Sequence, residues 1–214
     1  MADLNNKIYH TTTKILIATL FGFGIHTATL ADHHGKFHSR YLNSFDEKGT
    51  VKGKVMEAYL AQDALQMFCS TDKVDTGSDK FLKLIKEQQE NVVYPSNGKY
   101  MGDWKAGEKA AQSGKGLTWK DDMKATNGGG CYNCHQMTKE EVSFGTIGPS
   151  LYNYGKIRGN SEAMQKLTYA RIWNAKGYNV CSWMPRFGYY KILTEKQIKD
   201  IVALLLDPKS PVNK

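Results

Sequence analysis

The chain has 214 residues, of which 41% are hydrophobic and 23% charged, and its formal net charge at pH 7 is +8. This is the composition of an ordinary globular protein, and it excludes a collagen-like fibre and a wholly disordered chain. The positive charge favours an acidic partner or an anionic ligand, whereas the sequence has no basic helix, aromatic RNA-binding pattern or zinc-finger spacing that would indicate nucleic acid.

The first 31 residues have the pattern of a secretory signal peptide. Lys7 and Lys14 precede an apolar stretch from Ile15 to Leu30, which ends in the small-x-small sequence Thr29-Leu30-Ala31. The alternative is a membrane anchor that stays in place, but the stretch of about 16 residues is shorter than the roughly 20 that a spanning helix requires. We therefore expect residues 1–31 to be cleaved, and the mature protein to lie in the periplasm without a membrane span.

Residues 32–98 are expected to form a partly helical N-terminal extension. A polar stretch comes first, and the following pattern of apolar residues and good helix formers predicts a helix from Val55 to Cys69. Asp79 can cap a second helix that ends near Glu90. The turn-forming residues Tyr94–Gly98 then mark a boundary.

Residues 99–214 are expected to form an all-α domain with long loops. A short helix is predicted over Trp104–Gln112, and Ser161 can cap a further helix that runs toward Trp173. The final helix has the clearest signals, because Thr194 and Gln197 form a capping box before an apolar stripe. No alternating pattern of useful length predicts a strand.

The sequence Cys131-Tyr132-Asn133-Cys134-His135 carries the most specific chemistry in the chain. Two cysteines at this spacing can reach the two vinyl groups on one edge of a porphyrin, and the histidine that follows can direct its imidazole at the iron. A thioredoxin-like redox pair would need a βαβ context, and a structural zinc site would need a second pair of ligands. The sequence offers neither. We therefore expect one haem c, attached through Cys131 and Cys134, with His135 as an iron ligand.

Met184 is expected to be the second axial ligand of that iron. His135 is the only histidine in the expected domain, since the others lie in the signal peptide or at His33, His34 and His38 beside it. A haem with two histidine ligands would have to recruit that polar tail. Met184 instead stands in a loop before the final helix, and the proline after it stiffens the backbone. A methionine ligand also raises the reduction potential relative to a second histidine.

Two further residues are candidates for holding the haem. The carbonyl of Pro149 could accept a hydrogen bond from His135, because a ligating imidazole usually donates its other N–H to an oxygen. An ordinary turn at this Gly-Pro sequence is the alternative. Arg158 or Lys156 could reach a haem propionate, although most basic side chains only face solvent.

These features together resemble a class I cytochrome c, and more closely the SoxX family, the monohaem cytochrome subunits of bacterial SoxXA sulfur-oxidising complexes. The resemblance covers roughly residues 94–214, and residues 45–93 resemble the extension of longer members. Its most specific blocks are Met184–Gly188 and Asp207–Asn213. The segments that carry the resemblance are 102–109, 127–136, 144–151, 181–188 and 205–213.

The resemblance implies that the chain is an electron-accepting subunit of a complex of the L-cysteine S-thiosulfotransferase type. The catalytic cysteine would lie on SoxA, a second haem protein, and the complex would join thiosulfate to a cysteine of the carrier SoxYZ. A small soluble cytochrome c would then accept the electrons. Two alternatives stay open: an independent periplasmic electron shuttle, and a haem enzyme such as a thiosulfate dehydrogenase or a peroxidase. The enzyme would need an open sixth position with acid–base groups beside it.

Two cysteines, Cys69 and Cys181, are left over from the haem motif. In an oxidising compartment they most simply form a disulfide, which would tie the extension to the loop of Met184. The alternatives are two free thiols, or a thiol that reacts with a partner. Since Cys181 precedes Met184 by only three residues, a role of the disulfide in tuning this loop is a hypothesis.

Overall fold

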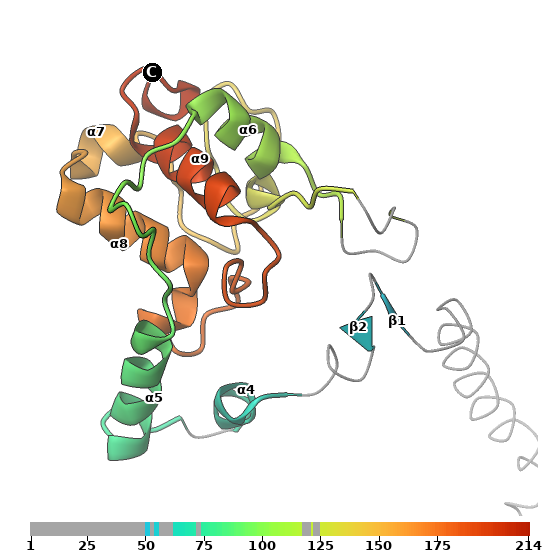
Figure 1. Cartoon of the computed structure of the whole chain (residues 1–214), viewed down its shortest axis with the longest axis vertical. Coiled ribbons are helices and arrows are strands. Elements are labelled where there is room, and N and C mark those ends of the chain that lie inside the picture. The colour runs from blue at the N-terminus through green and yellow to red at the C-terminus, as the bar shows by residue number, and fades with distance from the viewer. Residues whose placement is uncertain (1–49, 52–53, 56–61, 72–73, 117–120, 122–124) are drawn as a thin grey trace, which may run out of the picture. The chain divides into compact units, whose positions relative to one another are not determined.

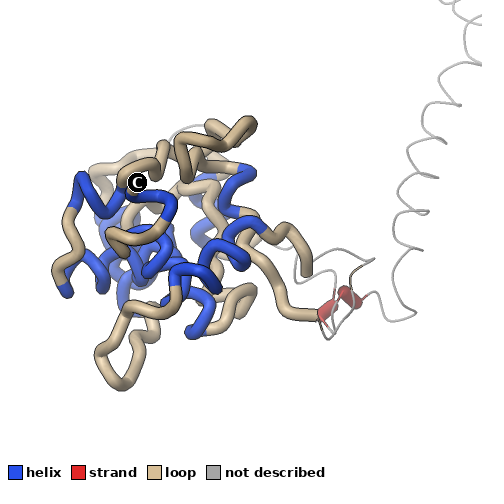
Figure 2. Tube along the Cα trace, turned by 90° about the horizontal axis from the view of Figure 1, so that it is seen from above, coloured by secondary structure: helices blue, strands red, loops and turns tan. Residues whose placement is uncertain are grey.

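Helices and the loops between them form nearly all of the described chain (Figure 2). The expected signal peptide and His33, His34 and His38 lie outside the described residues. Among the residues that are described, no helix has both the length and the apolar character needed to cross a membrane. The computed structural model describes residues 50–51, 54–55, 62–71, 74–116, 121 and 125–214.

The chain divides into two units, residues 1–51 and 52–214. The described residues of the first unit form strand β1 (Thr50–Val51), and the second unit contains all the other elements of the described residues. In chain order these are β2 (Lys54–Val55), α4 (Ala64–Cys69), α5 (Asp79–Glu90), α6 (Trp104–Gln112), the 3-10 helix η2 (Cys131–Asn133), α7 (Tyr154–Arg158), α8 (Glu162–Trp173), η3 (Ala175–Gly177), α9 (Glu195–Leu206) and η4 (Pro211–Asn213).

Three helices begin where the sequence predicts, and they establish the all-α fold class. Helix α6 covers the expected residues, with Asp103 as its N-cap. Helix α8 is capped by Ser161, whose hydroxyl accepts the N–H of Met164. Helix α9 begins with the expected capping box, in which Thr194 and Gln197 each accept the backbone N–H of the other.

Helix α9 lies at the centre of the main hydrophobic core, with α6 beside it (Figure 1). All residues from Asp200 to Leu206 are buried. The two helices approach so closely that a Cβ at Gly107 of α6 would lie 2.0 Å from the carbonyl oxygen of Asp200. Glycine at this position therefore allows the contact between α6 and α9, while α7, α8 and η4 pack on other parts of α9.

Among the described residues, the first helix of the extension is shorter than expected. Val55 lies in β2, and α4 begins only at Ala64, so the predicted start at Val55 is wrong; residues 56–61 lie outside the described residues. Asp63 fixes the observed start, because it forms a capping box with Gln66.

The cap of the second extension helix also differs from the expectation. Ser78, rather than Asp79, is the N-cap of α5, and its hydroxyl accepts the N–H of Phe81. Asp79 instead occupies the first turn, where a negative charge interacts favourably with the positive end of the helix dipole. Both residues are good caps, so the sequence alone did not separate them.

A second, smaller core joins the extension helices to the loop before Met184. Leu65 of α4, Leu84 of α5 and Val180 are its buried members. Cys69 and Cys181 form a disulfide at its edge, which confirms that expectation. Helices α4 and α5 are thus fastened to this loop by apolar packing, and α4 also covalently.

Candidate functional site

The loop before the Cys131 motif is held against the end of α6. Successive N–H groups of residues 128–130 donate to carbonyls in the last turn of α6 and just beyond it, at 2.7, 2.8 and 2.9 Å. A Cβ at Gly128 would lie 2.0 Å from the carbonyl oxygen of Ser113, and Gly130 has a φ of +56°. Glycines are therefore needed for the chain to pass this close to α6 and then turn into η2.

The same loop is tied to the beginning of α9. Gln197 of the capping box donates from Nε2 to the carbonyl oxygen of Asn127 at 2.7 Å. Asn127 in turn donates from Nδ2 to the carbonyl oxygen of Ile192 at 2.9 Å. Helices α6 and α9 thus fix the position of the motif together.

The motif itself forms a tight turn with both thiols unpaired. The N–H groups of Cys134 and His135 donate to the carbonyl oxygen of Cys131 at 3.1 and 3.0 Å. Both cysteines are free thiols. Burial raises the pKa of the Cys131 thiol to about 12, so that this thiol is protonated at neutral pH. Two free thiols within one turn suit thioether formation with the vinyl groups of a haem.

The ring of His135 is held in one orientation by Gly148 and Pro149. Its Nδ1 lies 2.7 Å from the carbonyl oxygen of Pro149, the acceptor that the sequence suggested. Because a carbonyl can only accept, Nδ1 carries the proton and Nε2 keeps a lone pair for a metal. A Cβ at Gly148 would lie 2.1 Å from Cε1 of the ring, so glycine is the residue that lets the imidazole lie here.

Met184 lies in the loop between η3 and α9. It is partly buried and packs against the main core, as does Cys131. Its N–H donates to the hydroxyl of Ser182 at 3.1 Å, which forms a local turn. Trp183 beside it is 90% exposed. The turn therefore places the thioether on the inner side of the loop and the indole on the outer side.

Arg158 lies at the C-terminal end of α7 and is exposed. Its guanidinium carbon is 5.3 Å from the centre of the Tyr154 ring. Tyr154 is buried and shares a hydrogen bond of 3.3 Å with the hydroxyl of Thr168 in α8. The observed partner of Arg158 is thus an aromatic ring, and its role at a haem propionate stays a prediction.

Trp173 is a buried donor that sequence reasoning took only as the end of a helix. Its indole Nε1–H has no hydrogen-bond acceptor among the described residues. The ring packs against the main core and against Gly188, where a Cβ would lie 2.1 Å from Cδ2. Buried indole N–H groups usually find a partner, but the burial of this one is seen only in the folded chain. A haem propionate is an acceptor that would satisfy this donor.

The residues present therefore fit a covalently attached haem. They provide two free thiols in one turn, an oriented imidazole with Nε2 available, a partly buried thioether and a buried donor without an acceptor among the described residues. A separate pocket of about 500 Å³ adjoins Tyr132 of the motif, but its walls include Glu108, Glu140 and Glu141. Those carboxylates would repel haem propionates, so this pocket does not suit the haem.

Comparisons with known proteins agree with this chemistry. Residues 123–208 match the family model described as Cytochrome c, a range that contains the motif, Met184 and α9. The chain is also 35% identical, over 213 aligned residues, to an uncharacterized lipoprotein of Aquifex aeolicus (strain VF5). That alignment covers 94% of this chain and 98% of the relative.

Proposed function

We propose that this chain, which carries a cytochrome c domain over residues 123–208 with covalently bound haem c, is an exported one-electron carrier with His135 and Met184 as iron ligands. Cys131 and Cys134 are the attachment points. Bound haem c supplies an iron that alternates between the ferric and ferrous states. The observation that carries the proposal is the geometry of His135, whose Nδ1 is engaged by Pro149 at 2.7 Å while Nε2 stays available.

The protein's part in this function is to hold and orient the ligands. The carbonyl of Pro149 fixes the tautomer of His135 and makes Nε2 more basic, as acceptors behind ligating histidines generally do. The packing of the ring on Gly148 limits its rotation. Trp173, and Arg158 or Lys156, are the proposed partners of the propionates. A methionine ligand such as Met184 would favour the ferrous state of the iron, which suits an electron acceptor.

Replacement of Met184 tests the second ligand. In Met184→Ala the near-infrared sulfur-to-iron band of the oxidised protein should disappear, and the reduction potential should fall. Met164→Ala is a matched control, because Met164 is also partly buried against the main core. Persistence of the band in Met184→Ala would remove Met184 from the site.

The cytochrome c domain and the lipoprotein relative indicate an exported, extracytoplasmic protein. We place it in the periplasm, with residues 1–31 as a cleaved signal peptide, 32–98 as the extension and 99–214 as the cytochrome domain. The intact mass of the purified haem protein tests the cleavage. A mass that includes residues 1–31 would contradict it.

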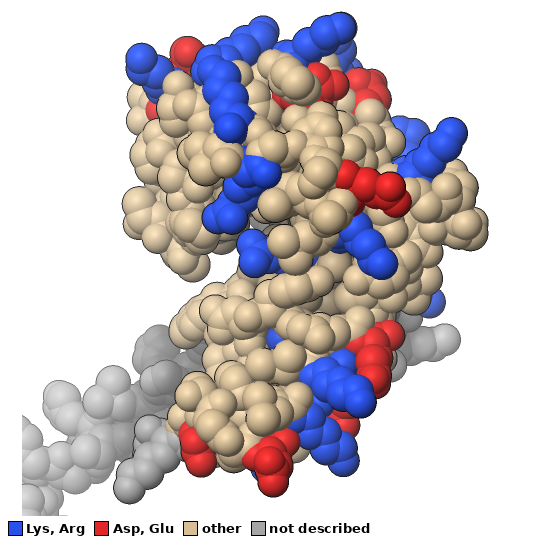
Figure 3. Space-filling view, turned by 90° about the vertical axis from the view of Figure 1, so that its left-hand side faces the viewer, with Lys and Arg blue, Asp and Glu red and all other residues tan. Residues whose placement is uncertain are grey.

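For the electron partner, we propose SoxA within a SoxXA complex that couples thiosulfate to SoxYZ. The resemblance of Met184–Gly188 and Asp207–Asn213 to the SoxX family supports this assignment. So does the net charge, which is +8 for the full chain and +7 without the Lys7, Lys14 and Asp3 of residues 1–31, and which suits an acidic partner or an anionic substrate nearby. On the face that Figure 3 shows, Lys and Arg side chains spread over the upper body, with Asp and Glu more frequent at the lower end.

Native purification tests the partner. The haem-stained protein is isolated from the periplasmic fraction, and the proteins that elute with it are identified by mass spectrometry. A second haem protein in fixed stoichiometry, with thiosulfate-dependent haem reduction when the carrier is added, supports the complex. A lone monohaem protein reduced by unrelated donors would favour the independent shuttle and leave the haem chemistry intact.

A further inference from the structure

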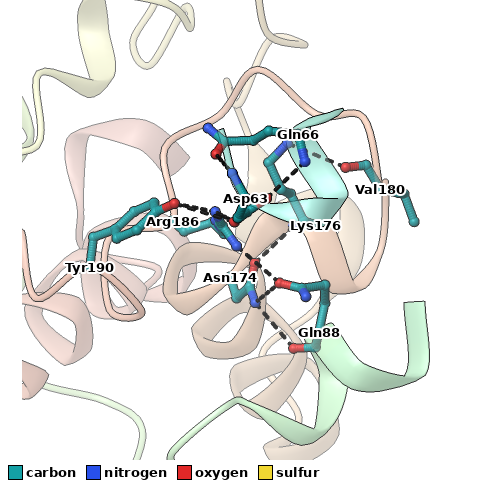
Figure 4. A network of polar contacts seen from close by, with 8 residues as sticks. All are labelled: Asp63, Gln66, Gln88, Asn174, Lys176, Val180, Arg186 and Tyr190. Carbon is teal, nitrogen blue, oxygen red and sulfur yellow. Dashed lines mark hydrogen bonds and ion pairs between the residues drawn. The ribbon is translucent and has the colours of Figure 1, made fainter. Parts of the chain in front are cut away.

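Arg186 follows Met184 by two residues, and its charged side chain is only 2% exposed. One terminal nitrogen, Nη2, forms an ion pair with Asp63 and donates to the hydroxyl of Tyr190; the other, Nη1, donates to Oε1 of Gln88 at 3.2 Å. Figure 4 shows the guanidinium between these groups. Asp63 and Gln88 belong to the N-terminal extension, so the extension fixes a residue of the Met184 loop.

The buried charge makes Arg186 dependent on Asp63. A guanidinium out of water needs a charged partner or several hydrogen bonds, and the carboxylate of Asp63 is its only acidic partner in the described part of the chain. Burial by itself would raise the pKa of Asp63, but hydrogen bonds from Arg186 and from the N–H of Gln66 lower it, so the carboxylate stays charged. The rings of Tyr189 and Tyr190, each 4.5 Å from the guanidinium carbon, add cation–π contacts.

Gln88 extends the hydrogen-bond network of Arg186 to Asn174, which lies before the Met184 loop. Its Oε1 also accepts from Nδ2 of Asn174 at 3.0 Å, and this Nδ2 lies 3.2 Å from the Gln88 carbonyl oxygen. Asn174 is fully buried and is the N-cap of η3. Next to it, Gln89 donates from Nε2 to the carbonyl oxygen of Gly177 at 2.8 Å. The last turn of α5 therefore holds η3 as well as Arg186.

The disulfide fastens the other side of Met184 to the same extension. Cys181 is three residues before Met184 and is bonded to Cys69, the last residue of α4. Asp63, directly before α4, holds Arg186. A single short helix thus fixes the chain on both sides of Met184.

We propose that Arg186 is a positioning residue for Met184, an inference that rests on the proposed ligation of the iron by Met184. Asp63 and Gln88 of the N-terminal extension hold Arg186 in place. Buried ion pairs often contribute little to stability compared with apolar packing of the same volume. Their best-attested role is to favour one conformation of the chain over its alternatives. Here the favoured conformation would be the one that keeps the thioether of Met184 in place to bind the iron instead of solvent or an external ligand.

The test compares variants of the full-length mature haem protein. Asp63→Asn removes the charge that pairs with Arg186 but keeps a good N-cap for α4, so it separates the ion pair from the cap. Arg186→Lys keeps the positive charge and serves as partial rescue of Arg186→Met. Lys86→Met is the control, because Lys86 lies on α5 with its side chain 77% exposed and, in the part of the chain that the structure describes, forms just a surface pair with Glu90.

Two measurements report the binding of Met184 to the iron separately from the unfolding of the chain. Loss of the near-infrared sulfur-to-iron band in urea is compared with loss of helical circular dichroism, and the rate of carbon monoxide binding to the reduced protein reports how often Met184 leaves the iron. In Asp63→Asn and Arg186→Met we expect the band to disappear at lower urea than the helical signal, and carbon monoxide to bind about tenfold faster. Arg186→Lys should be intermediate, and Lys86→Met should match the unmodified protein.

The outcomes separate this proposal from the proposed function. If band and helical signal shift together and carbon monoxide binding stays at its original rate, Arg186 is merely structural and the positioning role is overturned, while Met184 remains the ligand. If the unmodified protein shows no sulfur-to-iron band, the ligation by Met184 fails and this proposal fails with it. Should Arg186→Met not accumulate in folded form, Asp63→Asn and Arg186→Lys decide the question.

Discussion

At the scale of single residues, Gly148 is packed directly against the ring of His135, the proposed iron ligand. A Cβ there would lie 2.1 Å from Cε1 and 2.4 Å from Nδ1 of His135, far inside van der Waals contact. In Gly148→Ala the ring must turn away from Pro149, which weakens the hydrogen bond of 2.7 Å. We expect less haem per polypeptide and a loss of about 1–3 kcal/mol in the free energy of unfolding, the usual range for overpacking.

Gly114→Ala is the matched control for this substitution. The atom nearest to a Cβ at Gly114 is Nδ2 of Asn133 at 3.9 Å, an ordinary contact. Haem absorbance relative to protein mass, together with urea unfolding, measures both variants. Equal haem loading in Gly148→Ala and Gly114→Ala would contradict the tight packing of the His135 ring.

Asp63 gives the fold a dependence on pH with a definite sign. Burial opposes ionisation, but hydrogen bonds from Arg186 and from the backbone of Gln66 lower the pKa of Asp63 below its ordinary value of 3.8. A lowered pKa in the folded state means that the stabilisation is complete above the ordinary value and is lost as the pH falls through the folded one. The difference in urea midpoint between the unmodified protein and Asp63→Asn should therefore be constant near neutral pH and shrink in acid. A difference that persists unchanged in acid would show that the charge of Asp63 does not matter.

At the scale of helices, the contact of α6 with α9 can be tested by whether Gly107→Ala raises or lowers the free energy of unfolding. Alanine is a better helix former than glycine by about 1 kcal/mol, so Gly107→Ala would stabilise an isolated helix. A Cβ at Gly107, however, would lie 2.0 Å from the carbonyl oxygen of Asp200 in α9. We expect a net loss of about 1–3 kcal/mol in the free energy of unfolding, measured by urea titration. A higher free energy of unfolding for Gly107→Ala would mean that α6 and α9 can move apart without loss of stability.

Signals carried by neighbouring residues allowed the helices to be predicted from the sequence. The caps of α8 and α9 each depend on residues three positions apart, and both were found where expected. The haem motif is equally local. The start of α4 was missed because Val55 and the helix formers after it fit a longer helix, whereas Asp63 and Gln66 set a later beginning. Ser78 and Asp79 are adjacent and equally suited to capping.

Contacts between distant residues could not be predicted in this way. Arg186 and Asp63 are 123 positions apart, and no periodicity or motif links them. The acceptor for His135 was within reach of sequence reasoning only because Pro149 is 14 residues away, in a recognisable Gly-Pro turn. The buried Nε1 of Trp173 becomes informative only when the folded chain shows that it has no acceptor among the described residues.

At the scale of the whole molecule, the disulfide joins cysteines 112 residues apart, and the loop it closes contains the haem motif. In the chain-entropy account, closing a loop of this size stabilises the folded state by about 4–5 kcal/mol, because it restricts the unfolded chain. The core around the disulfide is small, with Leu65, Leu84 and Val180 as its buried members, so it depends on this bond more than the main core does.

Replacement of both Cys69 and Cys181 by serine should therefore loosen the extension before it harms the haem domain. We expect a lower urea midpoint, corresponding to a loss of up to about 4–5 kcal/mol, and earlier proteolytic cleavage in α4 and α5 than in α9. Mild reduction of the unmodified protein is the control, since it opens the disulfide but leaves thioether bonds intact, and it should reproduce both effects. If the double variant retained its urea midpoint and cleavage pattern, packing and the Arg186–Asp63 pair alone would hold the extension in place.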